Sequence, residues 1–153
     1  MKPDDSLLGL KLKMHYIIYT DGGSRGNPGP AATGYVIKND LGEVVLEGGA
    51  YLGVATNNHA EYQAVVQALV AVEQLFSPVQ DDRIHISFYL DSKLVVEQLS
   101  GRFKIKNQNL AQIAHEINET LKRLSIAATF SHIPRAQNAH ADALVNQALD
   151  NSR

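Results

Sequence analysis

Residues 19–37, YTDGGSRGNPGPAATGYVI, place a carboxylate directly before a long glycine-rich path. Asp21 ends an apolar segment, and five glycines lie between it and residue 35. A turn needs only one or two glycines, so the longer series indicates that something large approaches the backbone. The segment 15–20, HYIIYT, is β-branched and aromatic on both faces, which predicts a central strand covered on both sides. We therefore expect Asp21 at the end of a buried strand, beside a surface open to a ligand.

A hairpin and a long helix are predicted next along the chain. GYVIKND and GEVVLEGGAYL flank residues 40–42, Asp-Leu-Gly, which is typical of a hairpin turn. From residue 57 to 76 the apolar period becomes helical, with apolar side chains recurring at Tyr62, Val65, Leu69, Val72 and Phe76. Thr56 and Asn57 are alternative N-caps of this helix, and Pro78 lies beyond its end.

The second half of the chain alternates strand and helix patterns. The expected elements are a strand RIHISFYLD, helices over about 92–99 and 107–123, a last strand IAATFSHI and a closing helix NAHADALVNQALD. Three strands followed by alternating helices and strands predict an α/β fold with a mixed sheet. With no evident linker or repeat, we expect one domain over residues 14–150, preceded by a loose extension over residues 1–13.

Composition narrows the possible classes of protein. The chain has 153 residues, of which 44% are apolar, as expected for one globular domain with a sizeable core. It has no cysteine, which excludes disulfides and thiolate metal sites and favours a reducing compartment, so we expect a cytoplasmic protein. We also expect it to be a monomer. No apolar run approaches the roughly 20 residues that span a bilayer, so no membrane partner is expected. The net charge of −2 argues against general nucleic-acid binding but permits a local basic patch.

Four carboxylates border apolar surfaces. Asp21 and Asp91 each follow a predicted strand, and they emerge side by side if those strands are parallel neighbours. Glu61 lies about one turn into the first long helix, and Asp142 occupies the same kind of place in the last helix. Each acid alone is explained by a solvated helix face or a turn cap. Together they predict a shared acidic site.

Such a cluster requires a neutralising partner. Carboxylates repel one another, and burying them together is costly. Magnesium prefers oxygen ligands and is suited to phosphate chemistry, and Mn²⁺ can substitute for it. Two such ions about 4 Å apart can activate a water and stabilise a leaving oxygen. The glycine-rich path after Asp21 would then let a phosphate backbone lie against the chain.

Four blocks of the sequence resemble the signature blocks of ribonuclease H type 1. They are TDGGSRGNPGP, TNNHAEYQAVVQAL, YLDSKLVVEQL and HIPRAQNAHADALVNQA, in the family's order, and they extend over residues 15–150. The resemblance implies a ribonuclease H-like fold, with a five-stranded mixed sheet flanked by helices. It also implies metal-dependent endonucleolytic hydrolysis of the RNA strand of RNA–DNA hybrids, leaving a 5′-phosphate.

The resemblance assigns roles to individual residues. Asp21, Glu61, Asp91 and Asp142 become the metal-binding catalytic set, and His132, ten residues before Asp142, corresponds to the family's mobile catalytic histidine. On this basis Asn27, Thr56, Asn57 and Asn58 contact the substrate. Gly22 and Ser24, in the loop after Asp21, are further candidates for substrate contact. Short amides beside an acidic site are appropriate for reading the RNA 2′-hydroxyl, although TNN is also explained as a helix cap.

The chain departs from many relatives between the middle helices. The long basic insertion, rich in lysine and tryptophan, is replaced by SGRFKIKNQN, and the chain has no tryptophan. Arg102, Lys104 and Lys106 alternate with apolar residues, so they would point the same way in an extended segment and contact phosphates. An ordinary solvated loop is the alternative. Lys93 stands where some relatives have glutamine and could still reach a phosphate.

Two other functions remain open. One is a duplex-binding module of the same fold without catalysis, although all four acids are present. The other is a different nuclease or integrase-like enzyme sharing the fold, which would not be expected to carry GNPGP and TNN together.

Overall fold

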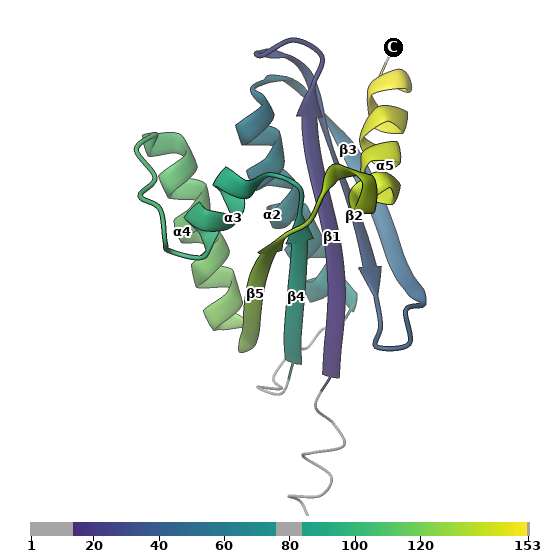
Figure 1. Ribbon diagram of the computed structural model, residues 1–153, viewed down its shortest axis with the longest axis vertical. Helices are drawn as coiled ribbons and strands as arrows, with labels where there is room; N and C mark the ends of the chain where they lie inside the picture. Colours follow the sequence, from purple (N-terminus) through teal and green to yellow (C-terminus); the bar gives the residue numbers. More distant parts are fainter. Residues whose placement is uncertain (1–13, 76–83, 153) are drawn as a thin grey trace, which may run out of the picture.

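The computed structural model describes residues 14–75 and 84–152, which form a mixed sheet flanked by helices (Figure 1). The strands are β1 (Met14–Ser24), β2 (Gly29–Lys38), β3 (Val44–Ala55), β4 (Ile84–Leu90) and β5 (Ile126–His132). The helices are α2 (Asn57–Leu75), α3 (Lys93–Leu99), α4 (Gln108–Arg123), α5 (Ala139–Asp150) and the short 3₁₀ helix η1 (Arg135–Asn138). The expected extension over residues 1–13 lies outside the described residues.

The sheet has five strands in the order β3-β2-β1-β4-β5. β1, β2 and β3 are antiparallel neighbours, whereas β4 is parallel to both β1 and β5. The predicted α/β class, the mixed sheet and the hairpin around residues 40–42 are therefore confirmed. Because β1 and β4 are parallel neighbours, the residues near their carboxyl ends lie side by side at the same end of the sheet.

Helices cover the two faces of the sheet unequally (Figure 1). α2, α3 and α4 pack on one face, where Ile18 and Phe88 belong to the main apolar core. α5 lies on the other face, where Val145 and Leu149 pack on Ala32 of β2. The expectation that β1 is fully covered on both sides is therefore wrong for its second face, where α5 leaves much of the strand half-buried. No helix among residues 14–75 and 84–152 is both long and apolar enough to cross a membrane.

The structure decides between the two candidate caps of α2. The backbone N–H of His59 donates to Thr56 Oγ1 over 3.1 Å, so Thr56 is the N-cap. The predicted apolar positions Tyr62, Val65 and Leu69 are buried as expected. Phe76 and Pro78, which the sequence placed at the end of this helix, lie outside the described residues.

The structure corrects the strand end in the glycine-rich stretch and gives two of its glycines a packing task. β1 does not end at Asp21 but continues to Ser24, with Asp21 opposite Gly34 of β2. At Gly22 a Cβ atom would lie only 2.2 Å from the backbone carbon of Ala60 in α2. At Gly34 a Cβ would lie 2.4 Å from the carbonyl oxygen of Ala141 in α5. These two glycines admit the protein's own helices, while Gly22 and Gly23 also line the cavity over the acids.

Candidate active site

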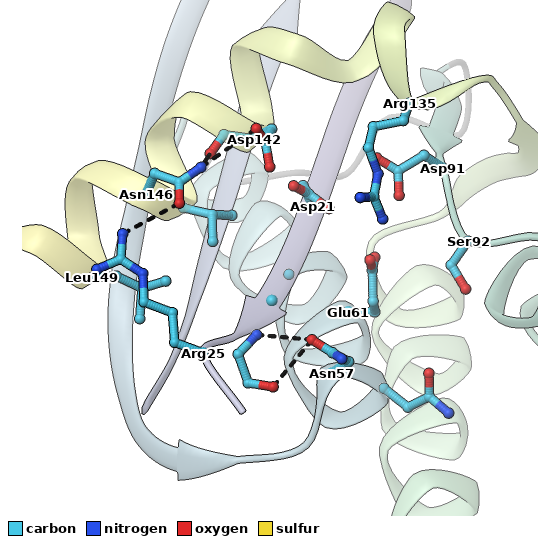
Figure 2. A pocket seen from close by; sticks show the side chains of 15 residues that line it. Asp21, Arg25, Asn57, Glu61, Asp91, Ser92, Arg135, Asp142, Asn146 and Leu149 are labelled. Atoms are coloured by element: carbon cyan, nitrogen blue, oxygen red, sulfur yellow. Dashed lines mark hydrogen bonds between the residues drawn. The ribbon is translucent and has the colours of Figure 1, made fainter. Parts of the chain in front are cut away.

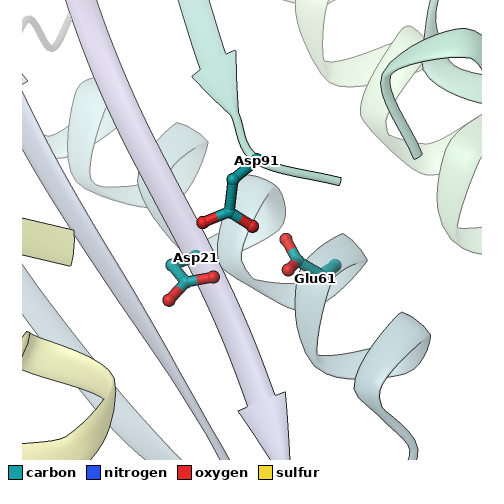
Figure 3. Close-up of side chains that lie close together, drawn as sticks. All are labelled: Asp21, Glu61 and Asp91. Carbon is teal, nitrogen blue, oxygen red and sulfur yellow. The ribbon is translucent and has the colours of Figure 1, made fainter. Parts of the chain in front are cut away.

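Three carboxylates converge at the edge of the sheet (Figure 3). Asp21 lies in β1, Asp91 directly follows β4, and Glu61 comes from the second turn of α2. One carboxylate oxygen from each of the three side chains lies within 4.8 Å of the other two. Asp21 and Glu61 are only 6% and 7% exposed, and Asp91 is half-buried. The predicted convergence of these three acids is therefore present in the structure.

Backbone packing sets this arrangement. Parallel pairing aligns Tyr19 with Tyr89, so Asp21 and Asp91 each lie two residues beyond the same register position. The close approach at Gly22 lets α2 reach β1 at Ala60, the residue before Glu61. The acids are thus held by elements in direct backbone contact, which limits how far they can move apart.

Asp142 lies beside these three acids but is not among those whose oxygens lie within 4.8 Å of one another. It lines the same cavity as Asp21, Glu61 and Asp91, on the wall formed by α5 (Figure 2). Its carboxylate Oδ2 accepts a hydrogen bond from Asn146 Nδ2 over 3.4 Å, and its carbonyl oxygen accepts another over 3.1 Å. The structure therefore brings the fourth predicted acid to the site, facing the cluster from the opposite helix.

The pKa values of the buried acids are raised, as expected for carboxylates that no positive charge neutralises. Burial raises the pKa of Asp21 to about 7, and the charges of Asp91 and Asp142 add to that effect. Burial, followed by the charges of Asp21 and Asp91, raises the pKa of Glu61 well above its usual value. Both shifts mean that ionising the whole cluster is unfavourable without a compensating positive charge.

The same residues meet the requirements of a divalent metal site. Glu61 Oε2 is buried and has no hydrogen-bond partner within residues 14–75 and 84–152. All donors are carboxylate oxygens, the ligands that hard cations such as Mg²⁺ and Mn²⁺ prefer. The acidic cluster can therefore bind a metal ion, which would use the orphaned oxygen and relieve the repulsion.

Two adjoining hollows receive the predicted substrate-contacting residues. A cavity of about 410 Å³ over the acids is also lined by Gly22, Ser24, Asn57 and Asn58. A second hollow of about 470 Å³ is lined by Asn27, Thr56, Asn58, Lys104 and Lys106, together with Leu94 and Gln98 of α3. Asn58 lines both, so the two hollows adjoin at this residue.

Hydrogen bonds join the end of β1 and the following loop to the start of α2, through Ser24, Asn27 and Asn57. The backbone N–H and the hydroxyl of Ser24 donate to Asn57 Oδ1, over 2.8 and 3.1 Å. The backbone N–H of Asn57 donates to Asn27 Oδ1 over 2.9 Å. Asn57 thus has a structural task beside any contact with substrate.

The expected common direction of the three loop cations is wrong. Arg102 Nε and Nη2 donate to the carboxylate of Glu97 over 2.7 and 3.0 Å. Arg102 lines a different hollow, which Phe130 of β5 shares. The chain bends here because the backbone N–H groups of Arg102 and Phe103 both donate to the carbonyl oxygen of Glu97. The substrate role of Arg102 therefore stays a prediction, without the support of a shared direction.

Two further predicted residues lie at the margin of the site. Lys93 is exposed at the start of α3, directly after the N-cap Ser92. His132 is exposed at the end of β5, paired with Leu90, the residue before Asp91. Their roles also stay predictions.

Sequence reasoning missed three residues of this site. Arg135 and Asn146 line the acidic cavity, and Asn138 is buried beside Asp91. Arg135 and Asn138 belong to η1, whose four residues are too few for a recognisable period. Asn146 lies one turn after Asp142 on the same helix, and that spacing is the signal that could have found it.

Comparison with known proteins gives a consistent answer. A family model described as "Reverse transcriptase-like" matches residues 19–148. Ribonuclease HI of Halobacterium salinarum is 42% identical over 134 residues, which cover 88% of this chain and 64% of that protein. Ribonuclease H of an Acidovorax species is 34% identical over 152 residues, covering 88% of this chain and 94% of that protein. The chain belongs to the ribonuclease H family.

Solved structures of ribonucleases H support the same fold. LC11-RNase H1, isolated from compost by a metagenomic approach, has been crystallised in complex with an RNA/DNA hybrid. That structure is 40% identical, superposes with a TM-score of 0.85, and covers 90% of this chain and 98% of its own. RNase H1 from Halobacterium salinarum is also 40% identical, with a TM-score of 0.81, and covers 90% of this chain and 99% of its own. The predicted ribonuclease H-like fold is therefore confirmed.

Proposed function

We propose that this protein is a metal-dependent endoribonuclease that hydrolyses the RNA strand of RNA–DNA hybrids and leaves a 5′-phosphate. The observation that carries the proposal is the largely buried set of Asp21, Glu61 and Asp91, which offer one oxygen each within 4.8 Å of one another beside a cavity of about 410 Å³. The hybrid-bound structure of LC11-RNase H1, at 40% identity, supports the choice of substrate.

Asp21, Glu61, Asp91 and Asp142 would hold two Mg²⁺ ions, with Mn²⁺ as a substitute. When bound, such ions supply activation of the attacking water and stabilisation of the leaving oxygen. The protein's own part is to fix its carboxylates in place, and Gly22 and Gly34 do so by setting how closely α2 and α5 approach. His132 would accept or relay a proton near the attacking water.

The hybrid would lie across the two adjoining hollows. Asn57 and Asn58 would meet 2′-hydroxyls of the RNA strand over the acids, where Gly22 and Ser24 also border the cavity. Thr56 and Asn27 would hold a phosphate of the DNA strand in the second hollow. The remaining proposed phosphate contacts are Lys93, Arg102, Lys104 and Lys106.

A panel of matched duplexes tests the proposal. The protein is incubated with Mg²⁺ and DNA–RNA, RNA–RNA or DNA–DNA duplexes of one sequence, with Asp21→Asn as the control. We expect cleavage of the RNA strand of the hybrid only, lost in Asp21→Asn. Binding without cleavage would favour the non-catalytic duplex-binding module, and equal cleavage of DNA–DNA would favour a different nuclease of this fold.

We also propose that the protein acts as a cytoplasmic monomer, with the activity contained in residues 14–150. The absence of cysteine from the sequence supports a reducing compartment. Light scattering during gel filtration tests the monomer, and hydrolysis by a chain limited to residues 14–150 tests the domain.

A further inference from the structure

A buried asparagine joins the strands that carry Asp21 and Asp91. Asn138, the last residue of η1, is 1% exposed. Its Nδ2 donates to the carbonyl oxygen of Thr20 over 2.8 Å and to Asp91 Oδ2 over 3.1 Å. Both partners can only accept here, so the nitrogen and not the oxygen of the amide must face them. The orientation of this side chain is therefore fixed by its neighbours.

The other end of the same amide is left without a partner. Asn138 Oδ1 is buried and makes no hydrogen bond in the part of the chain that the structure describes. A buried acceptor in this state is unfavourable for stability, so stability alone would favour another residue here. What the position requires is an N–H donor that reaches two acceptors at once.

Asn138 also sits where three acid-bearing elements meet. One of its bonds reaches β1 at the residue before Asp21, the other reaches the Asp91 side chain, and its own backbone begins α5, which carries Asp142. A free aspartate side chain can rotate, whereas a hydrogen bond to one oxygen fixes the direction of the other. Groups that orient metal ligands in this way strongly affect metal affinity and activity.

We infer that Asn138 is a positioning residue that holds the Asp91 carboxylate toward Asp21 and Glu61, and so sets the metal affinity of the cluster. The inference rests on the proposed function, since it concerns the same site. It assigns Asn138 no contact with substrate or with the reacting atoms.

Two substitutions and one control test the inference. Asn138→Ala removes both hydrogen bonds, and Asn138→Asp keeps the shape but turns a donor into a repelling acceptor. Val72→Ala, in the core contact of α2, lowers stability without touching the site. The readout without substrate is the Mg²⁺ concentration that gives half of the metal-induced rise in melting temperature. We expect this concentration to rise about 10- to 100-fold in both Asn138 variants and to stay unchanged in Val72→Ala.

Kinetics on a DNA–RNA hybrid supply the second readout. We expect kcat at fixed Mg²⁺ to fall about 10- to 100-fold in the Asn138 variants, with KM for the hybrid within about twofold of the parent. If Asn138→Ala does not fold, Asn138→Ser, which keeps one hydroxyl donor, replaces it in both measurements. Variants that melt earlier but keep the parental Mg²⁺ midpoint and kcat would show that Asn138 is only structural. A parent that binds Mg²⁺ but does not cleave hybrids would contradict the proposed function, while the Mg²⁺ midpoints would still decide the role of Asn138.

Discussion

The two ends of the proposed substrate surface are built in opposite ways. At the acidic end, Asp21 and Glu61 are less than a tenth exposed and come from elements in backbone contact. At the basic end, Lys104 and Lys106 are exposed on a loop, and the Arg102 side chain is 57% exposed and paired with Glu97. Chemistry on a phosphate needs fixed ligands, whereas attraction of a phosphate backbone tolerates mobile charges. Changes to the buried acids should therefore act as all-or-none, and changes at the basic end should be graded.

The largest effect is expected from Asp21→Asn. Losing one carboxylate removes charge that the metals need, and metal assistance is worth several kcal/mol, so hydrolysis of hybrids should fall by at least about 10³-fold. The fold should persist, because the substitution also relieves repulsion within the cluster. Hybrid cleavage and thermal melting measure the two effects. Cleavage at the parental rate would contradict the assignment of the acidic site.

The pH dependence of stability in the metal-free protein reports on the same repulsion between the carboxylates. The pKa of Asp21 is raised on folding from 3.8 to about 7, so the folded state favours the protonated acid. Its contribution to stability is thus fully present below about pH 4 and is lost as the pH rises to about 7. At about 1.4 kcal/mol per pKa unit, the loss should amount to a few kcal/mol.

Urea unfolding in EDTA at a series of pH values measures this loss. The difference in unfolding free energy between the parent and Asp21→Asn should grow in favour of the variant between about pH 4 and 7, and Mg²⁺ should reverse it. A difference that does not change with pH would show that Asp21 ionises freely in the folded protein.

Gly22→Ala tests whether the backbone contact between β1 and α2 fixes the positions of Asp21 and Glu61. The added Cβ would meet backbone atoms of α2, which cannot move aside cheaply, so the free energy of unfolding should drop by about 3 kcal/mol, the upper end for overpacking. Gly23→Ala is the matched control, since its Cβ would make only an ordinary contact of 3.7 Å with Val145. Chemical denaturation and hybrid hydrolysis should both separate the two variants. Equal behaviour of the pair would mean that α2 can shift without harm.

His132→Ala tests an exposed residue at the acidic end. General acid–base help is worth about 10²–10⁴ in rate, and we expect a fall in kcat of at most about 10², because bound metals already activate the water. KM should hardly change, since the duplex is held elsewhere. A kcat within about twofold of the parent, together with a lower melting temperature, would make His132 a structural residue.

The smallest and most graded effect is expected at the basic end. Changing Lys104 and Lys106 together to alanine should lower the log–log salt slope of hybrid binding by about 0.7–0.9 for each phosphate that the variant no longer neutralises. Arg102→Ala should lower it less, because Glu97 already pairs with that charge. The rate at saturating hybrid should stay near the parental value in all variants. An unchanged slope in the lysine variant would mean that this loop is only solvated.

The sequence predicted the acidic end better than the basic one, for physical reasons. Asp21 lies in β1 and Asp91 directly follows β4, each after a strongly patterned apolar segment, and parallel neighbours bring such residues together whatever the details of packing. The direction of Arg102 depends instead on two backbone hydrogen bonds to the carbonyl oxygen of Glu97, which alternation along a loop does not reveal. The tasks of Gly22 and Asn138 depend on neighbours that are distant in the chain, Ala60 for the glycine and Asp91 for the asparagine. Local pattern thus predicted which acids lie together, but not what holds them in place.

The close approach at Gly22 has a consequence for how this site can change. A helix that packs through side chains is adjustable, because a larger or smaller neighbour moves it slightly. α2 instead contacts the backbone of β1 directly at Gly22, beside Glu61. No side chain lies between the two backbones whose size could be changed. Repacking the core can therefore alter the melting temperature of this protein while the spacing between Asp21 and Glu61 stays constant. Engineering for heat resistance and engineering for metal preference are in this way separate problems, to be solved at different residues.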